Sequence, residues 1–419
     1  MLLKNPDLQR IMPVPMQPKL YPRLMLAVLT GLNILNYIDR NVLFGVQPLV
    51  KTEFHLTDAQ VGKLTSVFFV VYMVAAPLVG WLGDRFPRKN IVVLGIAVWS
   101  GFTFLTWLVR DYDQLLFRHA IVGIGEASYA AIAPTLIADS FPVERRGRML
   151  SIFFLGLPLG SALGIALGGP LGEHFGWRSP FMMAGIPGFV LAFLLWLLPE
   201  PPRGKPEAGA ISLERSTLKG LLTNGAFITA SLGMAAYTFA VGGLQVWIPT
   251  FLVRLRGLSV SRAAVVFGLI AAVNGIVATL IGGWMGDRQL KRKAGAYYTF
   301  SGVNMIIAVP FMVMAVYVAG KLMFPIIFVA VFFLLIVTGP SNAAVVNSVD
   351  ARIRSFALAV NIFVIHLLGD ACSPYLIGKI SDHTSLQVGF WAAFAAAALS
   401  GVIFLYGARF APALKTGLE

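Results

Sequence analysis

The sequence predicts an all-α membrane protein with twelve transmembrane helices arranged as two six-helix pseudo-repeats. Three observations support this fold class. Hydrophobic residues make up 57% of the 419 residues and charged residues only 12%; long apolar runs recur along the whole chain; and two short motifs of the first half return in the second. A soluble protein of this length needs far more polar surface, and a disordered chain needs low hydrophobicity. Composition therefore excludes both a wholly soluble enzyme and a disordered protein.

Each of the twelve runs is long enough to cross a bilayer, which takes about 20 apolar residues. The longer runs leave room for tilt within the membrane. The predicted spans are 23–50, 58–83, 89–109, 113–139, 147–172, 179–199, 224–253, 260–285, 294–319, 322–347, 355–380 and 386–408.

The longest polar break follows the sixth span and holds Pro201, Pro202 and Pro206 among mixed charges, as is typical of a solvated linker. Of the 33 lysines and arginines, 22 fall on the side of the N-terminus when the chain is threaded through twelve spans, and 9 fall on the other side. The positive-inside rule therefore predicts that both termini are cytoplasmic. The net charge of +14 reflects this topology and does not indicate a nucleic-acid partner. The predicted domains are a cytoplasmic arm over 1–22, a six-helix bundle over 23–199, a cytoplasmic linker over 200–223, a second six-helix bundle over 224–410 and a tail over 411–419.

The two halves repeat each other beyond their hydropathy. The segment Trp81–Arg85 (WLGDR) returns as Trp284–Arg288 (WMGDR), after the second span of each half. Val143–Arg148 is matched by Val349–Arg354 after the fourth span of each half. Parallel repeats of six helices are typical of transporters whose site lies between the halves, near the middle of the membrane.

Two segments resemble signatures of the major facilitator superfamily. The loop Gly80–Lys89 is similar to the signature that follows the second span, with Pro87 where that signature usually has glycine. The fourth span carries Arg118, Gly123 and Gly125 in the spacing of a second signature. The resemblance extends over nearly the whole chain.

Three further segments resemble the Spinster family within that superfamily: Asn36–Arg40, Gly123–Thr135 and His366–Gly378. This resemblance implies a transporter of lysolipids, of which sphingosine-phosphate and lysophospholipids are the known types. It also favours Asp39, Arg118 and Glu126 as functional positions.

Ionisable residues inside apolar spans are unfavourable there and indicate functional sites. In the first span Asn33, Asn36, Tyr37 and Arg40 follow helical spacing and form one polar stripe, with Asp39 at its edge. A carboxylate near a cation can gain or release a proton when its surroundings change, so we predict Asp39 and Glu126 as proton-coupling residues. The alternative is that these charges form buried pairs that fix helix register. The predicted substrate-binding residues are Arg40, Arg118, Asn36, Tyr37, His366 and Asp370.

The predicted inner loops carry acidic residues that positive-inside topology does not explain. We predict that they take part in a latch closing the cytoplasmic side, whereas topology alone would account for the neighbouring basic residues. The predicted latch residues are Asp84, Arg85, Glu144, Asp287, Arg288 and Asp350.

Small residues and prolines predict close packing and bends. Gly156, Gly160, Gly164 and Gly168 share one face of the fifth span and permit close helix contact. Prolines within spans are expected to kink them; these are Pro134, Pro158, Pro340 and Pro374. In the second half, the polar residues expected in the interior are Tyr237, Gln245, Trp247, Asn274, Asn342, Asn347, His366 and Asp370.

The sequence thus predicts a secondary active transporter of a lysolipid or similar amphipathic lipid that works by alternating access and is coupled to protons. One alternative is a proton-coupled transporter of a small organic anion or drug, which would be sealed from the bilayer, whereas a lipid carrier would tolerate a lateral opening. The non-transport alternative is an intramembrane enzyme or scaffold. The duplicated six-span plan argues against an enzyme. No P-loop and no metal-binding spacing of histidines or cysteines is present, so we predict no cofactor and no metal. The expected partners are a lipid substrate, protons and the bilayer. We expect a monomeric, multi-pass protein, in the plasma (inner) membrane if the source is bacterial.

Overall fold

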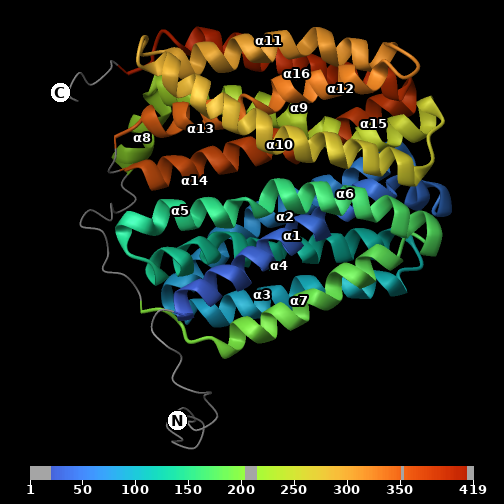
Figure 1. Ribbon diagram of the computed structural model, residues 1–419, viewed down its shortest axis with the longest axis horizontal. Helices are drawn as coiled ribbons and strands as arrows, with labels where there is room; N and C mark the ends of the chain where they lie inside the picture. Colours follow the sequence, from blue (N-terminus) through green and yellow to red (C-terminus); the bar gives the residue numbers. More distant parts are fainter. Residues whose placement is uncertain (1–19, 203–214, 351–352, 413–419) are drawn as a thin grey trace, which may run out of the picture.

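The protein folds into two groups of long helices that lie side by side (Figure 1). The structure is a computed structural model and describes residues 20–202, 215–350 and 353–412. Helices α1 to α7 pack on one another and form the N-terminal bundle, and α9 to α16 form the C-terminal bundle. The short helix α8, the start of α1 and the end of α16 all lie at the same end of the bundles (Figure 1). Most of the predicted arm, linker and tail lies outside the described residues.

The N-terminal bundle consists of α1 (Leu20–Glu53), α2 (Asp58–Arg85), α3 (Arg88–Leu105) with the 3-10 turn η2 (Thr106–Leu108), α4 (Tyr112–Ser140), α5 (Val143–Phe154), α6 (Gly156–Phe175) and α7 (Ser179–Leu197). After α8 (Arg215–Thr223), the C-terminal bundle consists of α9 (Gly225–Arg256), α10 (Val260–Leu290), α11 (Ala296–Tyr317), α12 (Met323–Leu335), α13 (Thr338–Asn347), α14 (Arg354–Ile365), the π-helical turn η4 (His366–Asp370), α15 (Ser373–His383) and α16 (Leu386–Gly407).

Eleven helical segments of the described chain are long and apolar enough to cross a membrane, and they match eleven of the predicted spans. The remaining predicted span is α1, a helix of 34 residues. Its buried polar side chains, including Asn33, Asn36 and Asp39, make it the least apolar of the long helices by sequence. The all-helical fold and the multi-pass membrane character are therefore confirmed.

Polar caps at the helix starts explain where several helices begin. The Thr57 side chain accepts the Gln60 amide N–H while Gln60 accepts the Thr57 N–H, which is a complete capping box for α2. Asn224 and Ser259 cap α9 and α10 in the simpler way, through one side-chain acceptor each. Gly257 ends α9 with φ at +67°, a conformation that side chains other than glycine rarely adopt.

Three predicted spans are interrupted near their middle, each beside a proline that we expected to kink its helix. Pro158 is the third residue of α6, Pro340 the third of α13 and Pro374 the second of α15. Proline has no N–H to continue the preceding turn, so the helix restarts there. Pro134, by contrast, lies inside α4, which continues through it.

The predicted glycine face of the fifth span packs against α1. A side-chain carbon added at Gly160 would lie 2.3 Å from the Ile34 carbonyl oxygen, and one at Gly164 would lie 2.6 Å from that of Ile38. The face therefore allows backbone-to-backbone approach and holds α1 in place within its bundle.

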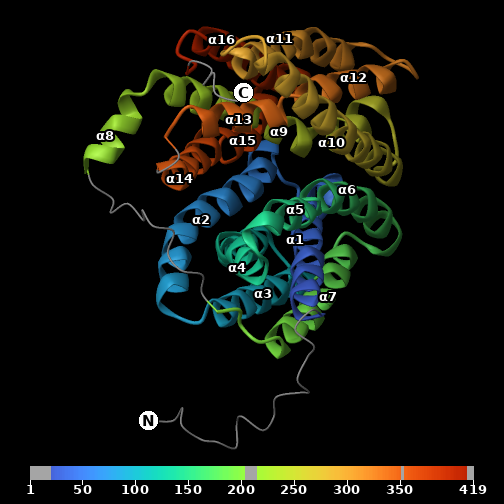
Figure 2. The same cartoon turned by 60° about the vertical axis from the view of Figure 1, so that its left-hand side comes forward.

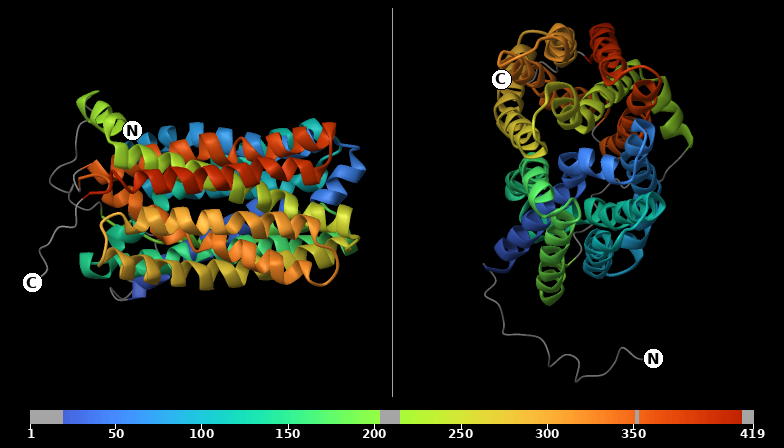
Figure 3. Two further views of the ribbon diagram at one scale, coloured as in Figure 1. Left: turned by 90° about the horizontal axis from the view of Figure 1, so that it is seen from above. Right: turned by 90° about the vertical axis from the view of Figure 1, so that its right-hand side faces the viewer.

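The bundles touch mainly along two helix pairs, α2 with α15 and α6 with α10 (Figures 2 and 3). Helix α1 also contacts α9 and α10. Close contacts between the bundles include the loop between α1 and α2 and the start of α10. We call this region, where those loops meet the ends of α9 and α15, the closed end.

Candidate functional site

Arg40 and Glu126 form a buried ion pair between α1 and α4. The Arg40 Nη2 and Nε donate to the Glu126 Oε2 at 2.6 and 3.1 Å. The Glu126 side chain is fully buried and that of Arg40 is 13% exposed. Removing either charge would leave the other buried without compensation, which is strongly unfavourable. The two predicted site residues therefore form a pair in which each buried charge compensates the other.

Aromatic rings enclose the Arg40 guanidinium. Its central carbon lies 4.9 Å from the Phe68 ring centroid and 5.0 Å from that of Tyr37. Phe69 and Tyr72 follow at 5.7 and 5.4 Å. Such rings attract a cation through their negative faces and keep water away from it, so they support the ion pair and limit access to it.

The C-terminal bundle contributes His366 and Asp370 to the same neighbourhood. His366 Nδ1 lies 2.9 Å from the Asp370 Oδ2, four residues further along the chain. The His366 ring stacks on Phe69 at 5.4 Å and meets Tyr72 edge-on at 5.9 Å. Both residues belong to η4, and single π-helical turns within membrane helices are frequent at functional sites.

Asp39 points into the N-terminal bundle. It is 3% exposed and lies against the Trp99 side chain, and no cation pairs with it among the described residues. Asn36 is equally buried, and its side chain lies against the Glu126 carboxylate. A buried charge without a counter-charge is unfavourable in an apolar interior and rarely persists without a role.

Arg118 does not join this group. Arg118 and Glu126 belong to the same helix, but Glu126 pairs with Arg40. The Arg118 Nη1 is buried, and no hydrogen bond or ion pair to it is present among the described residues. It lies two helical turns before Glu126 on α4, towards the end of the helix where α4 begins.

The repeated motif after the second span has the same local structure in both bundles. The Arg85 guanidinium stacks 3.9 Å from the Trp81 ring, and Arg288 lies 5.6 Å from the Trp284 ring. Asp287 accepts a hydrogen bond of 2.7 Å from the Tyr297 hydroxyl, which belongs to the same bundle. These contacts stay within their own bundles, so the latch role of the motif stays a prediction. Asp84 and Asp350 interact with other groups, and the Glu144 side chain lies outside the described residues.

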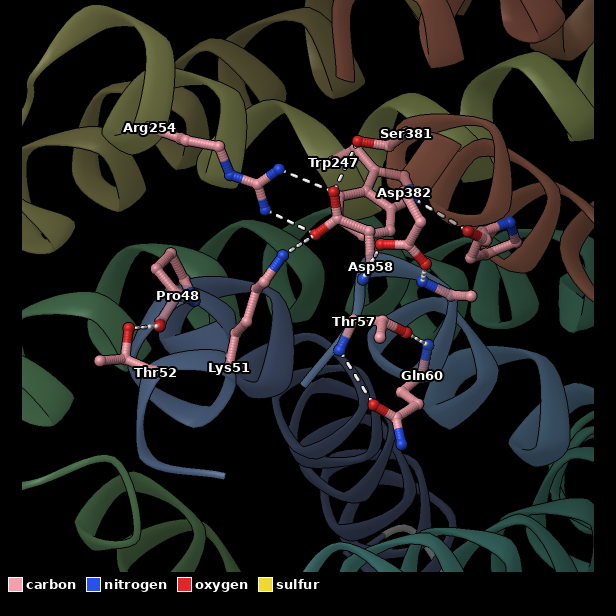
Figure 4. A network of polar contacts seen from close by, with 12 residues as sticks. Pro48, Lys51, Thr52, Thr57, Asp58, Gln60, Trp247, Arg254, Ser381 and Asp382 are labelled. Atoms are coloured by element: carbon pink, nitrogen blue, oxygen red, sulfur yellow. Dashed lines mark hydrogen bonds and ion pairs between the residues drawn. The ribbon is translucent and has the colours of Figure 1, made fainter. Parts of the chain in front are cut away.

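Asp58 ties the bundles together at the closed end, and sequence reasoning missed it (Figure 4). Its buried carboxylate accepts two hydrogen bonds from Arg254 of α9, at 2.6 and 2.7 Å. Ser381 of α15 donates another at 2.5 Å, and Lys51 of α1 completes the cluster. A bidentate arginine bound to a buried carboxylate is among the stronger polar contacts in proteins. We call Asp58, Lys51, Arg254 and Ser381 the Asp58 cluster.

Backbone contacts reinforce the cluster. Asp382 of α15 accepts the N–H groups of Asp58 and Ala59 at 2.6 and 2.8 Å, which satisfies the first turn of α2 with a carboxylate from the other bundle. A side-chain carbon at Gly378 would lie 2.3 Å from the Asp58 carbonyl oxygen. The Trp247 indole donates to the Pro374 carbonyl at 3.0 Å and fixes α9 to α15.

A cavity of about 510 Å³ lies between α5 and α6 on one side and α9, α10 and the α12–α13 segment on the other. Its wall is mainly apolar, and its rim includes Phe154 and Leu280, which are 52% and 69% exposed on the bundle exterior. The polar side chains on the wall are all uncharged: Ser151, Ser161, Tyr237, Gln245, Thr279 and Thr338.

The sequence model of one protein family, the Major Facilitator Superfamily, matches residues 29–369 of this chain. Protein spinster homolog 3 of Danio rerio is 35% identical over 384 residues, which cover 86% of this chain and 76% of the relative. Protein spinster homolog 1 of Homo sapiens is 36% identical over 387 residues, covering 86% and 73%. The chain belongs to the Spinster family of the Major Facilitator Superfamily. Sphingosine-1-phosphate transporter SPNS2 of Danio rerio is 35% identical over 396 residues, covering 88% and 77%.

Solved structures agree with this assignment. A bacterial homologue of the human lysosomal transporter Spinster, in an inward-facing and unoccupied conformation, superposes with a TM-score of 0.85 at 25% identity and covers 93% of this chain and 98% of its own. The same homologue in the occupied inward-facing conformation gives 0.79. A D-xylose–proton symporter, at 16% identity and a TM-score of 0.74, shares the fold. This Spinster-family chain is therefore a membrane transporter and not an enzyme.

Proposed function

We propose that this transporter moves a single-chain amphipathic lipid, of the lysophospholipid or sphingosine-phosphate type, by proton-coupled alternating access. The observation that carries the proposal is the cavity, because its mainly apolar wall and its exposed apolar rim suit an acyl chain that arrives from the bilayer. The name of the Danio rerio relative, a sphingosine-1-phosphate transporter, supports the same substrate class.

The closed end would face the outside of the cell. Its assignment rests on the positive-inside distribution of lysines and arginines and on the similarity to an inward-facing Spinster homologue. Helix α1 would then also cross the membrane, which brings the number of spans to twelve and places both termini in the cytoplasm. Transport to the outward-facing state requires the Asp58 cluster to separate.

The Arg40–Glu126 pair would provide the coupling. A proton on Glu126 removes its negative charge and releases the guanidinium of Arg40 from its partner. The freed cation, still within its aromatic rings, could then bind the phosphate of the lipid head. Asp39 is the second proton site, because a proton there removes a buried charge that no cation balances among the described residues.

The alternative, a carrier of a small organic anion or drug, is less well supported. Such a substrate has no acyl chain to fill a cavity whose wall is mainly apolar. Arg118, a predicted substrate-binding residue, pairs with none of the other site residues in the described part of the chain.

The proposal is tested with purified protein in liposomes and a labelled monoacyl phospholipid, with and without a pH gradient. We expect lipid transfer above that of protein-free liposomes and faster transfer with the gradient. Ala271→Trp, which places a large ring on the cavity wall, should stop lipid transfer. Leu269→Trp, on the same helix but 59% exposed and outside the cavity, serves as its matched control. Transfer of a small organic anion but of no lipid would refute the proposal.

A further inference from the structure

Three uncharged side chains form a small polar site where the cavity meets the junction of the bundles. Asn41 of α1 donates to the Tyr37 carbonyl at 2.8 Å and to the Ser161 hydroxyl of α6 at 3.2 Å. Gln245 of α9 donates its Nε2 to the Asn41 Oδ1 at 2.6 Å. We call Asn41, Ser161 and Gln245 the amide site.

The amide site belongs to both the cavity and the contact between the bundles. Ser161 and Gln245 line the cavity wall, and Asn41 lies behind them with 2% of its surface exposed. The Gln245–Asn41 bond joins the C-terminal bundle to the N-terminal bundle, apart from the Asp58 cluster at the closed end. A ligand in the cavity can therefore reach a bond that connects the bundles.

The Gln245–Asn41 bond joins one hydrogen-bond donor to one acceptor, and this limits which ligand groups can bind there. A group that inserts between the Gln245 Nε2 and the Asn41 Oδ1 must accept from the first and donate to the second. A hydroxyl does both, whereas a phosphate oxygen only accepts, and a quaternary ammonium does neither. A group that cannot do both leaves one buried amide atom unpaired, which is unfavourable.

A single-chain phospholipid carries such a hydroxyl beside its phosphate, where a diacyl lipid carries a second chain. Arg40, the proposed phosphate partner, directly precedes Asn41 on α1. We propose that the amide site binds the free hydroxyl of the lipid backbone and that the bound hydroxyl replaces the Gln245–Asn41 bond. This inference rests on the proposed lipid transport and specifies which single-chain lipids the transporter prefers.

Replacing the bond has a second consequence. When the hydroxyl of a bound substrate takes the place of Asn41 as the partner of Gln245, the direct Gln245–Asn41 hydrogen bond between the bundles is lost. Without substrate, that bond stays in place. The contact between the bundles at this point then runs through the bound hydroxyl, so it differs between the substrate-free and substrate-bound states.

The test compares three monoacyl phospholipids that share chain and head group and differ at one backbone carbon, with a hydroxyl, a methoxy group or hydrogen there. Transfer by the wild-type protein in liposomes should favour the hydroxyl lipid over both others by about 2- to 10-fold, the range of one neutral hydrogen bond. Gln245→Met, which keeps the length of the side chain, should bring the three rates to within about 2-fold of each other.

Two further variants make the outcome decisive. Ser161→Ala should reduce the hydroxyl preference without removing the Gln245–Asn41 bond. Val241→Ala, on the cavity wall but not in the amide site, should change all three rates by the same factor and keep the preference. Equal wild-type rates for the three lipids, or an unchanged preference in folded Gln245→Met, would overturn the inference while leaving lipid transport intact. Absence of transfer for all three lipids would instead refute the proposed function, and the inference with it.

Discussion

The Asp58 cluster offers the sharpest test of how the transporter closes. In Asp58→Asn one acceptor oxygen becomes an amide that can only donate, and the carboxylate charge is lost. Arg254 then loses its bidentate partner, and Lys51 loses its counter-charge. Since Arg254 and Ser381 belong to the C-terminal bundle while Asp58 belongs to the N-terminal bundle, these contacts exist only while the closed end is closed.

The size of the effect follows from the burial of the cluster. Hydrogen bonds to charged groups contribute about 1.5–3 kcal/mol each, and breaking a fully buried pair costs about 3–5 kcal/mol. The Asp58 side chain is 3% exposed, but that of Arg254 is 32% exposed and can be solvated when it loses its partner. We therefore expect a loss of about 2–3 kcal/mol, which raises the ratio of outward-open to outward-closed molecules by about 30- to 150-fold.

The assay is a distance measurement between spin labels on the two bundles, on a Cys372→Ser background that removes the native cysteine. Exposed positions near the closed end are Asp113, in the first turn of α4, and Lys321, in the loop before α12. Asp58→Asn should move the distance distribution towards longer values.

A matched control comes from the same end of the molecule. Glu53 binds Arg178 and Trp177, all within the N-terminal bundle. Glu53→Gln therefore removes a carboxylate without breaking a contact between the bundles and should leave the distances unchanged. An identical distribution for wild type and Asp58→Asn would refute the conclusion that the cluster holds the bundles together, as would an equal change in both variants.

Three further predictions concern the site and the packing. Glu126→Gln should abolish the pH dependence of transport measured in liposomes, because the group that exchanges the proton is gone; a wild-type pH profile would contradict this role. Arg118→Ala should slow anionic and neutral lipids by about the same factor, because Arg40 and not Arg118 is the proposed partner of the phosphate; a far larger loss for anionic lipids would contradict that assignment. Gly160→Ala should lower the unfolding temperature in detergent, since its methyl group lies 2.3 Å from the Ile34 carbonyl oxygen, whereas Gly283→Ala has open space and should not. Equal unfolding temperatures in the two glycine variants would contradict the packing argument.

Much of the fold was predictable because its signals are local. Apolar length, loop charge and proline position depend on neighbouring residues, and eleven spans and three of the four expected proline breaks follow from them. The glycine face of α6 was also predictable, since a four-residue repeat places small residues on one side of a helix whatever its partner.

The candidate site was predictable only as a set of residues. Asp39, Arg40 and Glu126 stand out because charge in an apolar span is rare, but their partners are distant in sequence: Arg40 and Glu126 are 86 residues apart. Asn41 could have been found as one more turn of the stripe formed by Asn33 and Tyr37.

Asp58 gave no such signal, because an acidic residue in the first turn of a helix is ordinary. Its partner Arg254 is, by sequence, an ordinary basic residue near the end of a predicted span. Asp58 and Arg254 matter because the two bundles bring them into contact, and sequence patterns within either bundle do not predict that contact.

The sequence by itself determined that the chain spans a membrane, that it repeats a six-helix unit and that a few charges remain where charge is unfavourable. Only the tertiary structure decided which polar groups face each other: Glu126 with Arg40, Asp58 with Arg254, and Gln245 with Asn41. The physical reason is that burial along one helix depends on local composition, whereas pairing depends on how helices cross, and the crossing is set by packing of the whole fold.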